Sequence, residues 1–214
     1  MSSGKKSACF ITLEGIEGAG KSSQVDNIRK QLEAAGKAVR TTREPGGTAL
    51  AEGLRALLLN HQLQVTPEAE LLMMFAARSS HIQEVIRPAL QAGEWVLCDR
   101  FTDASYAYQG GGRGISNGVI RQMEDFVQQD LQPDLTLLFD IDVELGLARA
   151  SARSDADRFE REEVEFFERI RRAYLARATE RPVNYVIIDA SQEFAAVSEQ
   201  VHEVIAGYLE RHAD

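Results

Sequence analysis

Apolar and polar positions follow two patterns along the chain, and their order predicts an α/β fold. Short, almost continuously apolar runs of strand length occupy residues 9–13, 38–42, 95–98, 135–139 and 185–188. Stretches with helical spacing of apolar residues lie between and after them, at 21–35, 49–59, 67–91, 117–129, 143–150, 161–179 and 195–211. Strands that alternate with helices form βαβ units, and continuously apolar strands are covered on both sides. The pattern therefore predicts a five-stranded parallel sheet with helices on both faces.

Composition narrows the class of protein. With 214 residues, 44% of them hydrophobic, the chain has room for one sizeable core, so we expect a single domain over residues 1–214. Residues 1–7 lack the apolar segment of a secretion signal and are expected to be a disordered tail, and no stretch approaches the length of a membrane span. Cys9 and Cys98 fall in apolar segments without metal-ligand spacing, which favours buried thiols in a reducing cytosol. The net charge of -9 argues against a nucleic-acid partner. We expect a soluble cytoplasmic protein.

Residues 15–22 read Gly-Ile-Glu-Gly-Ala-Gly-Lys-Ser, a complete G-x-x-x-x-G-K-S phosphate loop. The loop follows the first predicted strand and opens the first predicted helix, as phosphate binding requires. In such a loop backbone N–H groups surround phosphate oxygens, Lys21 reaches the β- and γ-phosphates, and the Ser22 hydroxyl ligates Mg²⁺. The helix dipole adds to the same anion site. A nucleoside triphosphate is expected to bind at Gly15, Ile16, Glu17, Gly18, Ala19, Gly20, Lys21, Ser22 and Ser23.

Further candidates follow the other strands, because ligands bind at the carboxyl ends of strands in such sheets. After the second strand, Arg43 precedes a turn stiffened by Pro45, and an ordinary turn with a surface ion pair is equally consistent. The third strand ends in Asp99 and Arg100, where an acid could hold Mg²⁺ or its waters and an arginine could grip a phosphate. A structural salt bridge is the alternative. Asp140 could also serve the metal, but Asp99 is favoured because its neighbours carry chemistry.

One pair on the long predicted helix has a spacing suited to a nucleobase. Phe75 and Arg78 are three residues apart and therefore share a face. A ring and a guanidinium so placed could stack on a planar base and bond its edge. A phenylalanine on a helix is more often part of the core, so both readings stay open.

Two segments are expected to be mobile. The glycine-dense run 109–114 reads as a loop, and the polar run 151–157 connects two helices. Arg149, Arg153 and Arg158 flank the second segment and would reach a phosphoryl group if it closed as a lid over about 150–160. Charge on a solvated face is the alternative.

In this order and at these distances, the motifs resemble those of bacterial thymidylate kinases over essentially the full chain. The resemblance rests on the phosphate loop, Thr-Arg-Glu-Pro-Gly-Gly-Thr at 42–48, Asp-Arg-Phe at 99–101, Ser-Tyr-Ala-Tyr-Gln at 105–109 and Asp-Arg-Phe-Glu at 157–160. The phosphate loop alone is common to many kinases and GTPases, whereas the combination is far more specific. The resemblance implies a P-loop NTPase three-layer sandwich, transfer of the γ-phosphoryl group of ATP to dTMP with Mg²⁺, a place in dTTP biosynthesis, and a homodimer.

The resemblance also implies roles for individual residues. The acceptor dTMP would be held by Glu17, Arg43, Pro45, Phe75, Arg78, Arg100, Ser105, Tyr108 and Gln109. Within this set Phe75 would stack on thymine, Arg78 would bond its O4 edge, and Tyr108 would lie near the sugar. Catalysis would fall to Lys21, Asp99, Arg100 and Arg153, with Ser22 and Asp99 at the metal and Arg149 at ATP. Arg153 is the best candidate for a charge that some relatives carry inside the phosphate loop.

Three alternatives remain open on the sequence. A kinase could act on another nucleoside monophosphate or on a deoxynucleoside, and Glu44 could then be the base that deprotonates a sugar hydroxyl. A GTP-binding switch would carry an Asn-Lys-x-Asp motif, which this sequence lacks. An ATP-dependent assembly factor would hydrolyse ATP without any small acceptor.

Overall fold

A computed structural model describes residues 8–152 and 158–211, and at its centre lies a parallel sheet. Its strands are β1 (Phe10–Glu14), β2 (Val39–Arg43), β3 (Trp95–Asp99), β4 (Leu135–Asp140) and β5 (Tyr185–Asp189). Their order is β2-β3-β1-β4-β5, and every neighbouring pair is parallel. Each predicted run lies within one residue of its strand at both ends. The predicted fold class is confirmed.

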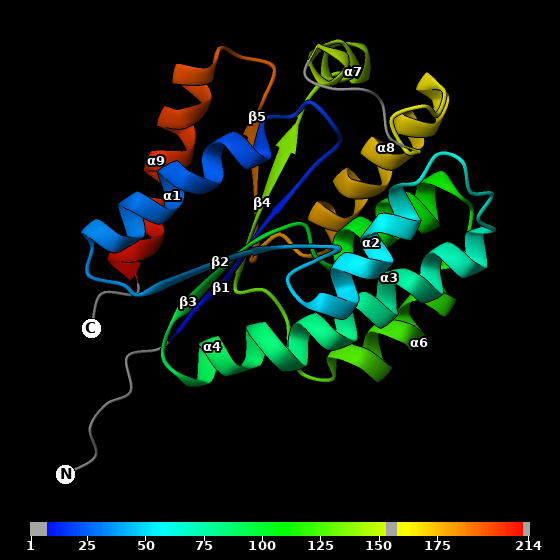
Figure 1. Cartoon of the computed structure of the whole chain (residues 1–214). Coiled ribbons are helices and arrows are strands. Elements are labelled where there is room, and N and C mark those ends of the chain that lie inside the picture. The colour runs from blue at the N-terminus through cyan, green and yellow to red at the C-terminus, as the bar shows by residue number, and fades with distance from the viewer. Residues whose placement is uncertain (1–7, 153–157, 212–214) are drawn as a thin grey trace.

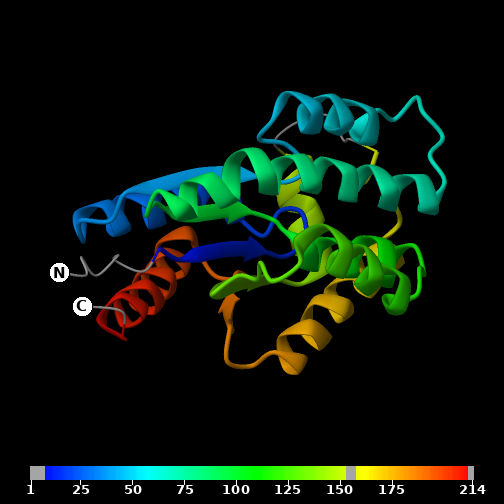
Figure 2. The ribbon, with the colours of Figure 1, turned by 90° about the horizontal axis from the view of Figure 1, so that it is seen from below.

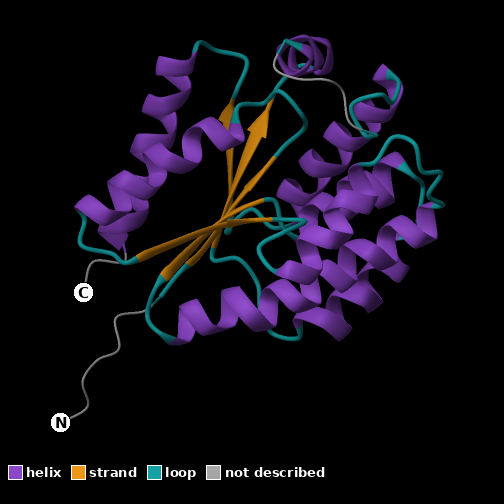
Figure 3. Ribbon diagram, viewed as in Figure 1, coloured by secondary structure: helices purple, strands orange, loops and turns teal. Residues whose placement is uncertain are grey.

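Helices cover both faces of this sheet (Figures 1 and 3). One face carries α1 (Lys21–Ala34) and α9 (Phe194–Arg211), which pack against each other. The other carries α3 (Pro67–His81), α6 (Asn117–Gln128) and α8 (Val164–Glu180), with α2 (Ala49–Leu59) packed outside α3. Helix α7 (Val143–Ser151) follows β4 and lies beyond the carboxyl ends of the strands (Figure 1). Among the helices described, none is long and apolar enough to cross a membrane.

The helix predicted over 67–91 is one continuous rod along the sheet, as Figure 2 shows from below. It consists of α3, the π-helix η1 (Ile82–Ile86) and α4 (Arg87–Gln91). Pro88 explains the change of winding, because it has no N–H to donate and its ring would clash with the carbonyl of Glu84 in a regular helix. The wider turn of η1 accommodates both effects.

The glycine-dense segment is helical, so the predicted loop at 109–114 is wrong over its first part. Helix α5 (Thr102–Ser105) continues into the π-helix η2 (Tyr106–Gly112), and neither was predicted. Helix α8 crosses η2 so closely that a Cβ on Gly111 would lie 2.7 Å from Ala173 Cβ. A Cβ on Gly112 would lie 2.6 Å from the ring of Phe166. These glycines therefore permit close helix packing and do not mark a flexible loop.

Candidate functional site

A cavity of about 400 Å³ opens at the carboxyl ends of β1, β2 and β3, where the strand pattern predicts a ligand. The phosphate loop, the turn after β2, the end of β3, α3 and η2 all contribute to it. It is lined by these predicted site residues: Glu17, Gly18, Gly20, Lys21, Ser22, Arg43, Pro45, Arg78, Asp99, Arg100, Ser105, Tyr108 and Gln109. Segments far apart in the sequence thus converge on one site.

The remaining predicted site residues do not line this cavity. They are Gly15, Ile16, Ala19, Ser23, Phe75 and Arg149. Arg153 lies outside the described residues, as do Asp157 of the fifth motif, the expected tail at 1–7 and most of the polar segment at 151–157.

The phosphate loop is held in a shape that only small residues allow. Gly18 has φ +73 and approaches α7 so closely that a Cβ would lie 1.8 Å from the carbonyl oxygen of Gly146. Lys21 Nζ donates to the carbonyls of Gly15 at 2.9 Å and Ile16 at 2.8 Å. Burial, followed by the nearby charge of Arg100, lowers the pKa of Lys21 to about 8. The lysine is thus fixed inside its own loop, where a bound anion would favour its charged form.

Two oxygens suited to a divalent cation meet between α1 and β3. Ser22 Oγ donates to Asp99 Oδ2 at 2.6 Å. Asp99 Oδ1 is buried and, among the described residues, has no hydrogen-bond partner. Asp140, the other candidate ligand, is instead bound by Arg171 through Nε at 2.6 Å and Nη2 at 2.9 Å. Because Asp99 has an oxygen without a partner and both oxygens of Asp140 are bound by Arg171, Asp99 fits the role of metal ligand better than Asp140 does.

Arg100 projects into the cavity from a strained backbone. Its φ is +70, in the left-handed region that a non-glycine residue rarely adopts. Its Nη1 donates to the carbonyl of Gly15 at 2.8 Å and to Tyr174 Oη at 3.2 Å, and its Nη2 donates to Glu17 Oε1 at 2.9 Å. The side chain of Glu17 also accepts from Tyr108 Oη. The strain and the converging bonds give the guanidinium one fixed direction.

A fully buried acid, Glu14, holds the backbone beneath Arg100. Glu14 Oε1 accepts from the Phe101 N–H at 2.7 Å, and Oε2 accepts from Tyr174 Oη at 2.9 Å. Burial and the negative charge of Asp103 raise the pKa of Glu14 to about 8. Because it fixes the next peptide of the chain, Glu14 supports the unusual conformation of Arg100.

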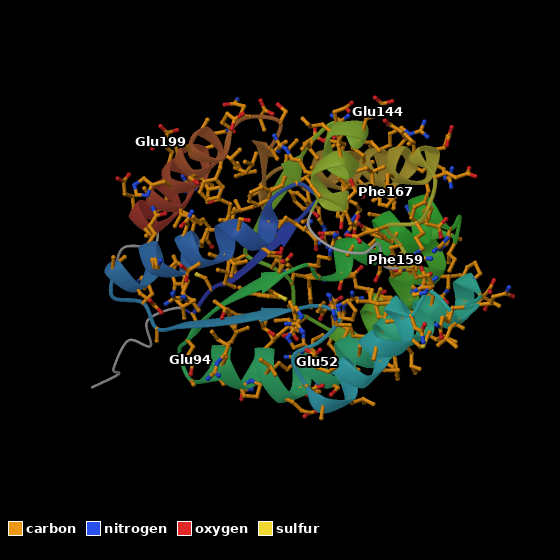
Figure 4. The ribbon with its side chains drawn as sticks, turned by 45° about the horizontal axis from the view of Figure 1, so that its top comes forward. Glu52, Glu94, Glu144, Phe159, Phe167 and Glu199 are labelled. Carbon is orange, nitrogen blue, oxygen red and sulfur yellow. The ribbon has the colours of Figure 1, made fainter. Side chains whose placement is uncertain are left out.

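Two arginines stand at the turn after β2. Arg43 lines the cavity and donates through Nη2 to both carboxylate oxygens of Glu52 at 3.0 Å. Glu52, labelled in Figure 4, also accepts from the Gly47 N–H, and this bond with the charge of Arg43 lowers its pKa. Arg55 of α2 lines the same cavity and donates to the carbonyl of Pro45 at 3.0 Å. Sequence reasoning missed Arg55, whose one signal is a charge in the apolar Leu-Arg-Ala-Leu-Leu-Leu run of a helix.

At the far end of the cavity, Phe75 is not part of the lining, although the sequence predicted that it would stack on a base there. Phe75 belongs to the core under α3, and the guanidinium of Arg78 lies 4.7 Å from the centre of its ring. Met74, one residue earlier, lines the cavity with Arg78. On α3, residues four positions apart, and not three, therefore lie on the face that lines the site. Gln109 donates through Nε2 to buried Glu70 at 2.7 Å, while its Oε1 is buried and has no partner among the described residues.

The arginines around the expected closing segment are held at its two ends. Arg149 donates through Nη1 to the carbonyl of Ala190 at 2.7 Å, which ties α7 to the loop after β5. Arg158 donates through Nε to the carbonyl of Leu58 at 2.7 Å and forms an ion pair with Glu70 at 2.8 Å. Its neighbour Phe159, labelled in Figure 4, lines the cavity.

Comparisons with known proteins agree with this geometry. The sequence model of the family described as thymidylate kinase matches residues 13–201. The chain is 57% identical over 202 residues to a thymidylate kinase of Pseudomonas fluorescens (strain Pf0-1), covering 94% of this chain and 96% of that protein. It is 55% identical over 206 residues to a thymidylate kinase of Pseudomonas entomophila, covering 96% and 98%. The crystal structure of thymidylate kinase from Ehrlichia chaffeensis superposes with a TM-score of 0.74 at 33% identity, covering 92% and 98% of the two chains.

Proposed function

The chain belongs to the thymidylate kinase family, and from this premise we propose that it is an enzyme that transfers the γ-phosphoryl group of ATP to dTMP, giving dTDP and ADP. One observation carries the proposal. A single cavity joins a phosphate loop to three arginines near the strand ends and, at its far end, to a buried arginine suited to a base. A triphosphate and a nucleoside monophosphate can therefore share the site.

Phosphoryl transfer asks the protein to align donor and acceptor and to neutralise spreading charge. Lys21 and the loop amides would hold the ATP phosphates. Arg43, Arg55 and Arg100 would hold the acceptor phosphate in line. That phosphate is already mostly ionised near pH 7, so the transfer does not require a general base.

Mg²⁺ is the cofactor that the residues fit. Ser22 and Asp99 would hold it, and the buried, unpartnered Oδ1 of Asp99 supports this assignment. No group of three or more acidic, histidine or cysteine side chains suited to a metal occurs among the described residues. Mg²⁺ commonly takes one or two protein ligands together with waters and substrate phosphates. When bound, the ion supplies charge neutralisation at the phosphates.

The base end favours a pyrimidine with a carbonyl at position 4. A guanidinium only donates hydrogen bonds, so Arg78 would bind O4 of thymine, whereas it could not accept a hydrogen bond from the 4-amino group of cytosine. The side chain of Met74 would pack against the base, the role predicted for Phe75. Gln109 Oε1 offers an acceptor at the same end. Of these three contacts, the donors of Arg78 support dTMP over dCMP.

A kinase that acts on a deoxynucleoside would need Glu44 as its base, but both carboxylate oxygens of Glu44 already have hydrogen-bond partners. Glu44 accepts hydrogen bonds from Arg78 on one oxygen and from His81 on the other. A base that deprotonates a sugar hydroxyl needs a lone pair directed at it, so Glu44 is poorly suited to that reaction.

Closure of the segment at about 150–160 over ATP, with Arg153 reaching the transferred group and Arg149 near ATP, is also part of the proposal. The single domain and the cytoplasmic location are part of the proposal as well.

A homodimer is supported by exposed apolar side chains on neighbouring helices. Val119 and Phe126 are two helical turns apart on α6, Phe126 is 80% exposed, and Leu72 of α3 is 57% exposed.

The test measures ADP formation from Mg-ATP with dTMP, dUMP, dCMP, dGMP, AMP or thymidine, and without any acceptor. We expect strong preference for dTMP. Equal ADP release without an acceptor would favour the assembly-factor alternative, and preference for thymidine would favour a deoxynucleoside kinase.

A further inference from the structure

A buried chain of hydrogen bonds connects β2 to the base end of the cavity. Glu44 Oε2 accepts from Arg78 Nε at 2.7 Å, and Glu44 Oε1 lies 2.9 Å from His81 Nδ1. On its other side, His81 Nε2 lies 2.6 Å from Thr42 Oγ1. Glu44, Arg78 and His81 are 5%, 2% and 0% exposed. Their geometry is therefore set by one another and not by water.

The chemistry of these partners defines the histidine tautomer. An ionised carboxylate accepts hydrogen bonds and donates none, so the proton between Glu44 and His81 belongs to Nδ1. In the neutral ring Nε2 then accepts from the Thr42 hydroxyl. His81 thus takes its orientation from β2 and transmits it to Glu44.

The same imidazole supports the turn that follows β2. Gly47 has φ +86, and a Cβ there would lie 2.7 Å from His81 Cδ2 and 2.9 Å from His81 Nε2. The turn carries Pro45, and Arg43 lies just before it. The second glycine of the Glu-Pro-Gly-Gly motif is therefore required both by its backbone angle and by contact with His81.

Arg78 depends on this arrangement for its direction. Besides Nε to Glu44, it donates through Nη1 to Ser105 Oγ at 3.0 Å and through Nη2 to the Phe101 carbonyl at 3.2 Å. Each terminal nitrogen keeps a second N–H for a ligand. The bond from Nε is the shortest of the three and the one made to a carboxylate, so it contributes most to the direction of those donors on a long, flexible stem.

We propose that His81 is a positioning residue for acceptor specificity: it orients Glu44, which aims the Arg78 guanidinium at the pyrimidine base. This inference rests on the proposed function and deepens it. It assigns a role to a buried histidine that touches no substrate. Loss of His81 should therefore weaken acceptor binding and base discrimination and leave ATP binding intact.

The experiment compares His81→Leu, His81→Asn and His81→Gln with wild type, and uses His61→Leu, an exposed position, as the matched control. For each protein, KM for dTMP, KM for ATP, kcat, and the ratio of kcat/KM for dTMP and dCMP are measured. Asparagine can place an amide N–H where Nδ1 stood, so it can still donate to Glu44. Glutamine reaches the place of Nε2 and cannot.

For His81→Leu we expect KM for dTMP to rise about tenfold, the effect of losing one charge-assisted hydrogen bond, and the dTMP:dCMP ratio to fall, with KM for ATP unchanged. Asparagine should restore both values and glutamine should not. If His81→Leu fails to fold, the contrast between asparagine and glutamine carries the test.

Equal losses in the asparagine and glutamine variants, or a lower Tm with all kinetic ratios unchanged, would overturn the inference. Failure of the proposed function is distinguishable, because wild type would then form no ADP in response to dTMP.

Discussion

Glu14 lies at the carboxyl end of β1, fully buried beneath the strained backbone of Arg100. Burial is the largest cause that raises its pKa from 4.5 to about 8, and the charge of Asp103 acts in the same direction. Arg100, the Phe101 N–H and Tyr174 oppose this rise. Replacement of Glu14 by glutamine keeps the size of the side chain and removes its ionisation.

The magnitude follows from the two pKa values of Glu14. A carboxyl whose pKa is higher in the folded chain than in the unfolded chain holds its proton more tightly when folded. Its contribution to stability is therefore complete below about pH 4.5 and is lost as the pH rises through about 8. Between pH 5 and pH 8 the loss amounts to roughly 3 to 4 kcal/mol.

The assay is urea unfolding followed by circular dichroism at intervals from pH 5 to pH 8. Subtracting the unfolding free energy of Glu14→Gln from that of wild type cancels the titration of other groups. We expect this difference to fall by roughly 3 to 4 kcal/mol across the interval, with the steepest slope between pH 5 and pH 7. Glu203→Gln, at an exposed position of α9, serves as the control and should give a flat difference.

A flat difference for Glu14→Gln as well would refute the reasoning. It would mean that Arg100, the Phe101 N–H and Tyr174 together offset burial and the charge of Asp103, so that the pKa of Glu14 stays near its ordinary value. A rise with pH would be a still stronger contradiction, since it would require a lowered pKa.

Other substitutions test separate parts of the site. Asp99→Asn should lower kcat on the order of 10²-fold and raise the Mg²⁺ concentration needed for half-maximal rate, because it removes the charge of a metal ligand; an unchanged Mg²⁺ dependence would argue against the assignment. Tyr174→Phe should destabilise the chain by about 1 to 3 kcal/mol in urea unfolding, because Glu14 loses a donor inside the core; no loss would mean that another group replaces the hydroxyl. Met74→Ala should raise KM for dTMP several-fold with KM for ATP unchanged, whereas equal increases for both substrates would count against contact with the base. Phe126→Glu should shift a dimer toward monomer in light scattering, and a wild type that is already monomeric would remove the dimer from the proposal.

Four of the five strands could be predicted because buried parallel strands are mostly apolar, whereas β2 is largely polar and partly exposed. A charged residue directly follows each predicted run, so the end of each strand is visible to within one residue. The segment 102–112 could not be predicted in this way. Glycines usually indicate a turn, and the reason for Gly111 and Gly112 lies on α8, more than fifty residues later in the chain.

The residues of the site also differ in how well the sequence predicts them. Residues that face a ligand cluster in short motifs at strand ends, and there the spacing predicted the cavity lining correctly for Lys21, Asp99 and Arg100. On α3 the spacing failed, because positions three and four residues before Arg78 are both on its face of the helix. Phe75 packs in the core and Met74 lines the cavity, and the periodicity of the helix does not distinguish these two positions.

The residues that hold the cavity lining in place are harder to predict from the sequence. Glu44 stands inside a recognised motif and Glu14 directly before one, yet their partners, His81 and Tyr174, belong to helices elsewhere in the sequence and to no motif. A buried carboxylate must find donors wherever the fold brings them, so its partners are defined by packing and not by sequence distance. A close relative could therefore keep every motif and still change acceptor specificity through a residue such as His81.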